Sequence, residues 1–360
     1  MKRIKVSPNQ SAIFRVRSFK RLAAILHCSG EELEKLAASE TNYMEYDQDG
    51  RWIEAPKPKI KAIHRRFAAL LAQIETPDYL HSSVKKRSYV TNARDHVAEQ
   101  STAKVDIKKF YRSSRSGQVY SFLTNDLEWS GDVAGLMTRI LTHNGHLPTG
   151  GNASPLLSFW VYKDLFDAVN EVARESSAVF SLYVDDMTLT GRFVRRKTIH
   201  DIRRLVGDVR LKAHKIKYFP PGTSKVITGV AQTKTGPKVP FPRQIRIREA
   251  EEALRRAQNN DERFDALKPL VGRLCEAAEI DPVTWRGKRD RAIREKQEID
   301  RARIADTGIP RGISVAATPN IPHAGDEPPW AMPAPRTTSA PAVSETDQDI
   351  DVLDPSIANG

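Results

Sequence analysis

The chain has 360 residues, of which 39% are hydrophobic, and its 57 Lys and Arg residues outnumber its 45 Asp and Glu residues to give a formal charge of +12. This apolar content can build one large or two modest domains, and no apolar run approaches the roughly 18 residues that a membrane-spanning helix needs. The two cysteines, Cys28 and Cys275, have no companions at metal-binding spacing, so we exclude a disulfide framework and a structural zinc site and expect a soluble cytoplasmic protein.

The first hundred residues predict helices and one hairpin. Ser29 and Gly30 form a cap and a break between two helical patterns. Further along, Asp49-Gly50 is a turn signal, so we expect a hairpin around residues 47–50. Apolar residues at helical spacing predict helices over residues 19–26, 31–38 and 60–74.

The middle of the chain predicts strands, and the part that follows predicts helices. Residues 103–107 form a short apolar strand that ends next to an acidic residue. Two β-prone apolar runs, 178–184 and 187–190, flank a second acidic group. Helices are predicted over residues 158–172, 249–257, 263–278 and 292–304.

The basic charge is concentrated before residue 305. Residues 1–304 hold 55 of the 57 basic and 37 of the 45 acidic residues, a balance of +18. Such an excess suits a polyanionic partner, because neutralised phosphates release counterions, although a scattered basic surface explains it equally well. Residues 305–360 are rich in Pro, Ala, Ser, Thr and Asp, so we expect a disordered tail there.

Three carboxylates stand at chemically informative positions. Asp185 and Asp186 lie between the two β-prone runs, where a tight hairpin turn is expected, and Asp106 lies near the end of the 103–107 strand. Asp pairs are ordinary turn residues, but adjacent carboxylates repel each other unless a cation lies beside them. If the strands are neighbours in one sheet, the three carboxylates converge into a ligand set for two Mg²⁺ ions, or Mn²⁺ as the alternative, which serve phosphoryl transfer.

A turn-rich segment, residues 145–155, lies between these carboxylates in the sequence. Pro148 stiffens it, while Gly150 and Gly151 allow the backbone to approach a ligand closely or to adopt a positive φ. Pro155 then suits the first turn of a helix. Taken by itself, the segment is a loop-to-helix junction.

In chain order, the strand with Asp106, the turn Leu147-Pro-Thr-Gly150 and the hairpin Tyr183-Val-Asp-Asp186 resemble the palm motifs of reverse transcriptases. Asn92-Ala93…His96 and Val226-Ile-Thr-Gly229 are similar to two motifs typical of retron reverse transcriptases. The sequence is therefore identified as similar to the retron type over residues 19–304.

This resemblance implies an α+β fold with the layout of a right-hand polymerase. The fingers, with the N-terminal helices, would take residues 1–100, the palm with an antiparallel sheet residues 101–235, and the helical thumb residues 236–304. The disordered tail over residues 305–360 matches no part of the family.

The resemblance also implies roles for individual residues. Asp106, Asp185 and Asp186 fall on the catalytic aspartates that bind metal, with Ile107 as a further metal-binding position. Tyr111 falls on the aromatic gate that selects deoxynucleotides. The other nucleotide-binding positions are Arg51, Gly150 and Lys215, and a solvated lysine is an alternative interpretation of Lys215. The expected RNA-binding residues are Asn92, His96, Arg246, Arg255, Arg256, Lys268 and Arg273.

Two of these assignments have structural alternatives. Asn92 and His96 are equally well explained as capping and core hydrogen-bonding residues, and the helical Arg and Lys residues as a solvated surface.

Thr149 departs from the family, in which many members carry Gln, and so removes an amide able to contact nucleotide or template.

The implied activity is RNA-directed DNA synthesis. A retron enzyme copies a dedicated structured non-coding RNA, which is both primer and template, into single-stranded DNA that starts from a guanosine 2′-OH. Its partners are this RNA, the DNA product, dNTPs and, in antiphage defence, an effector protein. The alternatives are another bacterial reverse transcriptase, either group II intron-like or defence-associated, and a non-catalytic RNA-binding protein with a polymerase fold.

Overall fold

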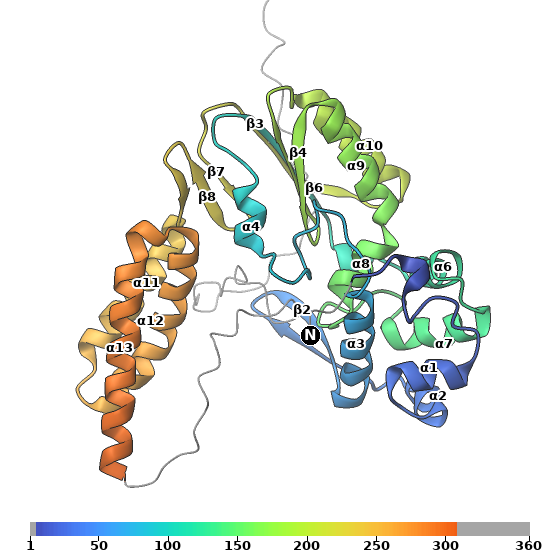
Figure 1. Ribbon diagram of the computed structural model, residues 1–360, viewed down its shortest axis with the longest axis horizontal. Coiled ribbons are helices and arrows are strands. Elements are labelled where there is room, and N and C mark those ends of the chain that lie inside the picture. The colour runs from blue at the N-terminus through green and yellow to red at the C-terminus, as the bar shows by residue number, and fades with distance from the viewer. Residues whose placement is uncertain (1–4, 308–360) are drawn as a thin grey trace, which may run out of the picture.

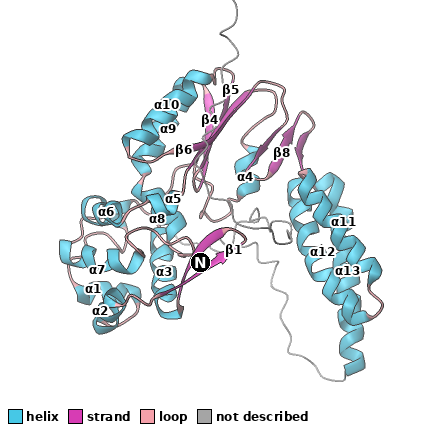
Figure 2. Cartoon of the chain, turned by 180° about the vertical axis from the view of Figure 1, so that it is seen from behind, coloured by secondary structure: helices cyan, strands magenta, loops and turns pink. Residues whose placement is uncertain are grey.

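A computed structural model describes residues 5–307 of the chain. The predicted tail begins inside its last helix, which continues to Thr307, and the remainder of that prediction lies outside the described residues. Strands occupy the centre of the molecule and helices stand on both sides of them (Figure 2). Within residues 5–307, no helix combines the length and the apolar character needed to cross a membrane.

The N-terminal part forms one helical limb with a hairpin, as the sequence predicts. Ser18 and Ser29 cap the first two helices, because each side chain accepts a backbone N–H of the first turn. The hairpin turns at Asp49 and Gly50, which both have positive φ. The elements are a short 3₁₀ turn η1 (Pro8–Gln10), helices α1 (Phe19–Leu26), α2 (Gly30–Ala38) and α3 (Pro58–Leu71), and strands β1 (Tyr43–Gln48) and β2 (Arg51–Pro56).

A four-stranded antiparallel sheet forms the centre. Its order is β4-β5-β3-β6, so that β3 lies between the second strand of the β4–β5 hairpin and β6. Helices α9 and α10 pack against one face of this sheet (Figure 1). The strands are β3 (Ser101–Ile107), β4 (Ala178–Tyr183), β5 (Asp186–Gly191) and β6 (Ala213–Phe219).

The prediction of one helix over residues 158–172 is wrong. The chain instead forms α8 (Ser154–Val161) and α9 (Lys163–Glu175), which are separated at the non-helical Tyr162. Buried side chains surround most of α8, whereas α9 buries only one face, and it does so partly against β4. Two such different environments require the chain to change direction between them. The other helices of this part are α5 (Phe110–Ser113), α6 (Ser116–Ser121), α7 (Gly131–Leu141) and α10 (Arg196–Asp208), with a π-turn η2 at Phe122–Asp126.

A second hydrophobic core joins the C-terminal helices to a small sheet and to a helix from much earlier in the chain. Tyr89, Val90 and Ala93 of that early helix, α4 (Tyr89–Arg94), belong to this core. The predicted C-terminal helices are confirmed, and each begins earlier than expected. The remaining elements are β7 (Lys225–Ile227), β8 (Val230–Thr233), β9 (Gly236–Lys238), α11 (Phe241–Arg256), α12 (Asn260–Ile280) and α13 (Pro282–Thr307).

Candidate active site at the hairpin tip

Three carboxylates meet at the tip of the β4–β5 hairpin. Val105 of β3 pairs with Met187 of β5, so the next residues along these antiparallel strands, Asp106 and Asp186, lie opposite each other. Opposite residues of an antiparallel pair project from the same face of the sheet. Asp185 lies in the turn just before, close enough for both of these charges to act on it. The expected convergence of the three carboxylates is therefore confirmed, whereas their catalytic role remains a prediction.

Negative charge is concentrated at this tip. The pKa of Asp185 is raised to about 7, first by burial and then by the charges of Asp106 and Asp186. Burial also raises the pKa of Asp106, although the positive charges of Lys215 and His214 oppose this effect. A carboxylate group in such surroundings is stabilised in its charged form by a nearby cation.

Two basic side chains accompany the carboxylates. Lys104, two residues before Asp106 on β3, has its Nζ 3.0 Å from Asp186 Oδ2. Similarly, His214 Nδ1 on β6 lies 3.7 Å from Asp106 Oδ1. The sequence reasoning missed both residues, although Lys104 could have been found from the alternation of side chains along a strand.

The chemistry of the donors suits Mg²⁺, which prefers carboxylate oxygen. Within the described part of the chain, however, no three His, Cys, Asp or Glu side chains are already arranged to hold a metal ion. Asp106 and Asp186 instead face His214 and Lys104, respectively. Ile107 has its side chain in the core, and its role at a metal site remains a prediction.

The β1–β2 hairpin and helix α5 bring two more predicted residues to this tip. Lys109 has a φ of 51° and so turns the chain from β3 into α5, which carries Tyr111. Burial, followed by the charge of Asp185, raises the pKa of the Tyr111 hydroxyl, and Arg51 opposes this. Arg51 acts in the same direction on Asp185. Hence the charges of Arg51 and Asp185 both act on Tyr111, although the three residues are far apart in the sequence.

Lys215 reaches the site because β6 contains a bulge. Lys104 pairs with Lys217, but Asp106 pairs with His214, so β6 has one residue more than β3 between these two pairs. Lys215 lies in the bulge with a φ of 46°. Bulges redirect side chains next to functional sites, and here the charge of Lys215 lowers the pKa of Asp106.

The turn that carries Gly150 is fixed to strand β2 by a buried glutamate that the sequence reasoning missed. Glu54, only 1% exposed, accepts hydrogen bonds from His146 Nε2 (2.9 Å) and from the Thr149 N–H (3.2 Å). The Gly150 N–H donates to the Glu54 carbonyl oxygen, and a Cβ at Gly150 would lie 2.9 Å from that oxygen. Gly150 therefore permits close packing of two backbones, and its contact with a nucleotide remains a prediction.

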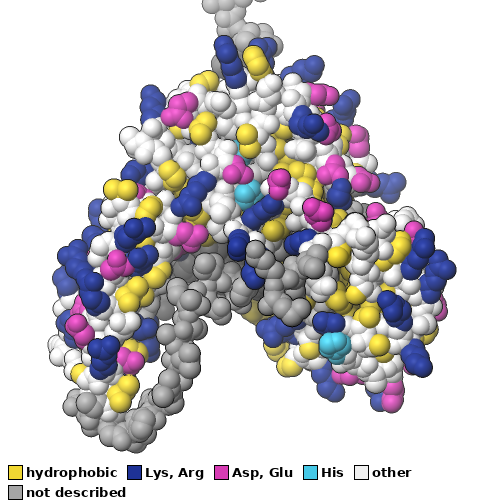
Figure 3. Space-filling view, viewed as in Figure 1, with side chains coloured by type: hydrophobic (Ala, Val, Ile, Leu, Met, Phe, Trp, Pro, Cys, Tyr) yellow, Lys and Arg dark blue, Asp and Glu magenta, His cyan; other side chains and the backbone are white. Residues whose placement is uncertain are grey.

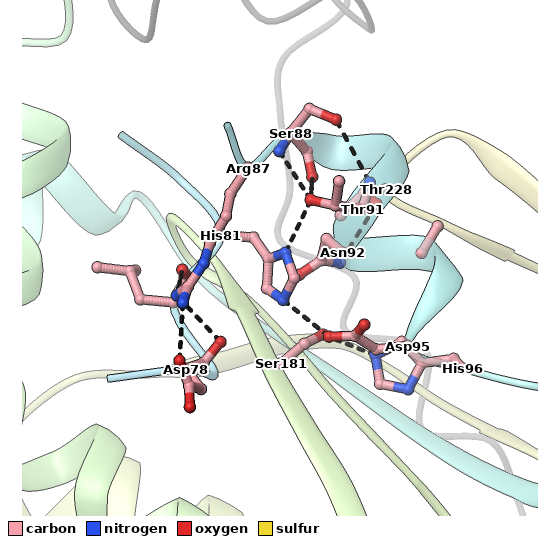
Figure 4. A network of polar contacts seen from close by, with 12 residues as sticks. Asp78, His81, Arg87, Ser88, Thr91, Asn92, Asp95, His96, Ser181 and Thr228 are labelled. Carbon is pink, nitrogen blue, oxygen red and sulfur yellow. Dashed lines mark hydrogen bonds and ion pairs between the residues drawn. The ribbon is translucent and has the colours of Figure 1, made fainter. Parts of the chain in front are cut away.

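Asn92 and His96 lie in the interior (Figure 4). Asn92 Nδ2 donates to Thr228 Oγ1 at 3.3 Å, and His96 Nε2 lies 2.6 Å from Ser181 Oγ. Their exposed fractions are 0% and 1%, and burial lowers the pKa of His96 to about 3, so its ring is neutral. The expectation that these two side chains contact RNA is wrong for this structure, because neither reaches the surface. Their contacts instead favour the alternative of core hydrogen bonding.

The predicted RNA-binding residues of the C-terminal helices fall into two groups. Arg246 and Arg273 line a cavity of about 160 Å³ between α11 and α12. By contrast, Arg255, Arg256 and Lys268 are exposed, and the last two make ion pairs within their own helices. Basic side chains are spread over the face shown in Figure 3, including the α11–α13 limb.

Comparisons with known proteins agree with the motifs. No protein-family model matches the chain. The Retron Se72 reverse transcriptase of Salmonella heidelberg (strain 579083-10) is 24% identical over 216 residues, which cover 56% of this chain and 57% of that protein. The Retron Mx65 reverse transcriptase of Myxococcus xanthus is 28% identical over 160 residues, 39% of this chain and 37% of the relative. The Retron Ec86 reverse transcriptase of Escherichia coli is 21% identical over 147 residues, 41% and 46% of the two chains.

The chain thus spans about half the length, or less, of the curated relatives it matches. Among solved structures, a foamy viral protease-reverse transcriptase in complex with double-stranded DNA has 14% identity and a TM-score of 0.39, covering 76% of this chain and 42% of that one. A score this low does not define the fold. The resemblance to retron reverse transcriptases is confirmed by the sequence relatives.

Proposed function

We propose that this chain is an RNA-directed DNA polymerase of the retron type, acting in the cytoplasm. The observation that carries the proposal is the meeting of Asp106, Asp185 and Asp186 at the tip of the β4–β5 hairpin. The relatives named retron reverse transcriptases support it independently. In detail, the enzyme copies a dedicated structured non-coding RNA, primed from a 2′-OH, into a branched RNA–DNA product, and it serves antiphage defence with an effector protein.

The reaction joins a primer hydroxyl to the α-phosphate of a dNTP and releases pyrophosphate. Asp106, Asp185 and Asp186, with the Ile107 backbone, would hold two Mg²⁺ ions, which activate the hydroxyl and stabilise the leaving oxygen. Arg51, whose charge already acts on Asp185, neutralises the triphosphate as it approaches the carboxylates.

Two other side chains complete the nucleotide site. The Tyr111 ring, packed beside Phe110 with ring centroids 6.0 Å apart, closes the space that a ribose 2′-OH would need. Lys215, whose charge lowers the pKa of Asp106, supplies a proton or a positive charge to the departing pyrophosphate.

We propose fingers over residues 1–100, palm over 101–235 and thumb over 236–304. The proposed fingers and palm share the first hydrophobic core, whereas α4 and strands β7 and β8 belong to the same core as the thumb helices. The cavity lined by Arg243, Arg246 and Arg273 also holds Glu276, which pairs with Arg243 at 2.8 Å, and we propose that an RNA phosphate contacts the guanidinium groups here.

Primer extension tests the activity. The doubly substituted protein, Asp185→Asn with Asp186→Asn, should incorporate no labelled dNTP on a primed RNA template in Mg²⁺, while it still binds the RNA. Asp208→Asn, an exposed change at the end of α10, is the matched control and should retain full activity. Incorporation by the double variant would show that the active site lies elsewhere.

The retron type has its own test. Cells that express the chain with its neighbouring non-coding RNA should contain a branched RNA–DNA molecule, detected as DNA that shortens when ribonuclease removes the attached RNA. If the cells contain only linear DNA while the purified protein extends primers fully in vitro, the polymerase activity is supported but the retron type is rejected.

A further inference from the structure

The residue just before the first aspartate of the hairpin has an unusual backbone. Val184 has a φ of 60°, a region that β-branched residues rarely adopt. A conformation of this kind persists only where the surrounding structure holds it, and such positions gather at functional sites. The backbone of Asp185 follows directly, so whatever holds Val184 also orients the Asp185 carboxylate.

A buried serine from outside the sheet fixes the Val184 backbone. Ser82 Oγ accepts a hydrogen bond from the Val184 N–H at 3.0 Å. Ser82 is only 3% exposed and the hydrogen bond is part-buried, so water has limited access to this N–H. No motif of the sequence indicates Ser82, which is 102 residues away from Val184.

The backbone next to Ser82 is fixed against β4. The Leu182 N–H donates to the Tyr79 carbonyl at 2.7 Å, and the His81 N–H donates to the Leu182 carbonyl at 2.9 Å. These two bonds form a short parallel bridge between Leu80 and Leu182. As a result, Ser82 is held in register with the turn that follows β4.

Side chains anchor the same segment to its other neighbours (Figure 4). His81 Nδ1 lies 3.0 Å from Thr91 Oγ1, and its Nε2 lies 2.8 Å from Asp95 Oδ2. Arg87 Nη1 donates to the carbonyls of Pro77 and Leu80, both at 2.7 Å. Because Thr91 lies on α4, this anchor connects the hairpin tip to the second core.

We propose that Ser82 is a positioning residue for the polymerase reaction: its hydroxyl holds Val184 in the left-handed conformation and thereby sets the direction of the Asp185 carboxylate. The inference rests on the proposed function, because Asp185 is the group being positioned. Ser82 itself touches neither nucleotide nor primer.

The test compares Ser82→Ala with Ser83→Ala, the same chemical change one residue later, where the described part of the chain shows no hydrogen bond to the hydroxyl. Ser82→Ala should lower kcat by about 10-fold or more, since a small displacement of a reacting group is costly, while the KM for dNTP changes by about twofold or less. Ser83→Ala should leave both constants unchanged. The melting temperature of Ser82→Ala should fall by roughly 2–10 °C, because the Val184 N–H loses its acceptor, so kinetics are measured well below the transition of each variant.

Repeating the test in a protein that carries Val184→Gly separates positioning from a merely structural effect. Glycine adopts positive φ without strain, so Val184→Gly no longer depends on the serine. In that background, Ser82→Ala should lower kcat by about threefold or less. An equal loss in both backgrounds, or no loss in either, overturns the proposal.

Hydrogen exchange gives a readout that does not depend on activity. Ser82→Ala should speed exchange of the Val184 amide by about 10-fold or more, and Ser83→Ala should not. Unchanged exchange overturns the proposal even if kcat falls. An inactive wild-type protein whose Val184 amide nevertheless responds to Ser82→Ala would reject the polymerase function and leave the Ser82 contact established.

Discussion

Glu54 offers a sharp test of how the β1–β2 hairpin is attached to the rest of the molecule. Replacing it by alanine leaves the His146 Nε2–H and the Thr149 N–H without their acceptor, in a site where Glu54 is 1% exposed. A buried donor left unsatisfied costs about 1–3 kcal/mol. Since the Thr149 N–H is only part-buried, we expect Glu54→Ala to lower the free energy of unfolding by about 2–4 kcal/mol, and the melting temperature by roughly 5–15 °C.

The matched control lies directly across the hairpin. Glu45 pairs with Glu54 in the β1–β2 register, but its partners are at the surface. Urea unfolding followed by circular dichroism should show a clearly smaller loss for Glu45→Ala than for Glu54→Ala. Because Arg51 begins the strand that Glu54 anchors, Glu54→Ala should also raise the KM for dNTP at a temperature where the variant is folded. Equal destabilisation by the two variants would refute the reasoning.

Three further predictions concern the interior and the metal. His96→Ala removes the contact with Ser181 and a buried ring, so the free energy of unfolding should fall by about 2–4 kcal/mol, while filter binding shows unchanged RNA affinity for the folded variant. Burial lowers the pKa of Lys225 to about 8, so between this value and 10.5 the unfolded state binds more protons and stability should rise with pH. Denaturation at pH 8 and pH 10 should show this rise, of roughly 1–3 kcal/mol, in the wild type relative to Lys225→Met, and a parallel pH dependence of the two would contradict it. Chelation with EDTA should stop DNA synthesis and spare RNA binding, and activity that survives chelation would argue against metal-dependent chemistry.

Much of the local structure follows from the sequence alone. Ser18 and Ser29 cap the helices that follow them, and Asp49-Gly50 supplies the positive φ that the β1–β2 hairpin requires. The order of the three palm-like motifs predicts the similarity to retron reverse transcriptases, and the two acidic segments predict the meeting of Asp106 with the hairpin tip. These features depend on neighbours within a few residues or on the ends of adjacent strands, which a pattern can indicate.

Only the tertiary structure decides which other side chains lie beside the carboxylates and which contacts fix the neighbouring turns. The bulge that turns Lys215 toward Asp106, the burial of Asn92 and His96, and the hold of Glu54 on the Thr149 turn each join segments dozens of residues apart. Such contacts depend on the register of paired strands and on which polar groups remain to be satisfied once the core has formed. A strand pattern in the sequence fixes which residues alternate, but it does not fix which distant donor each buried acceptor will meet.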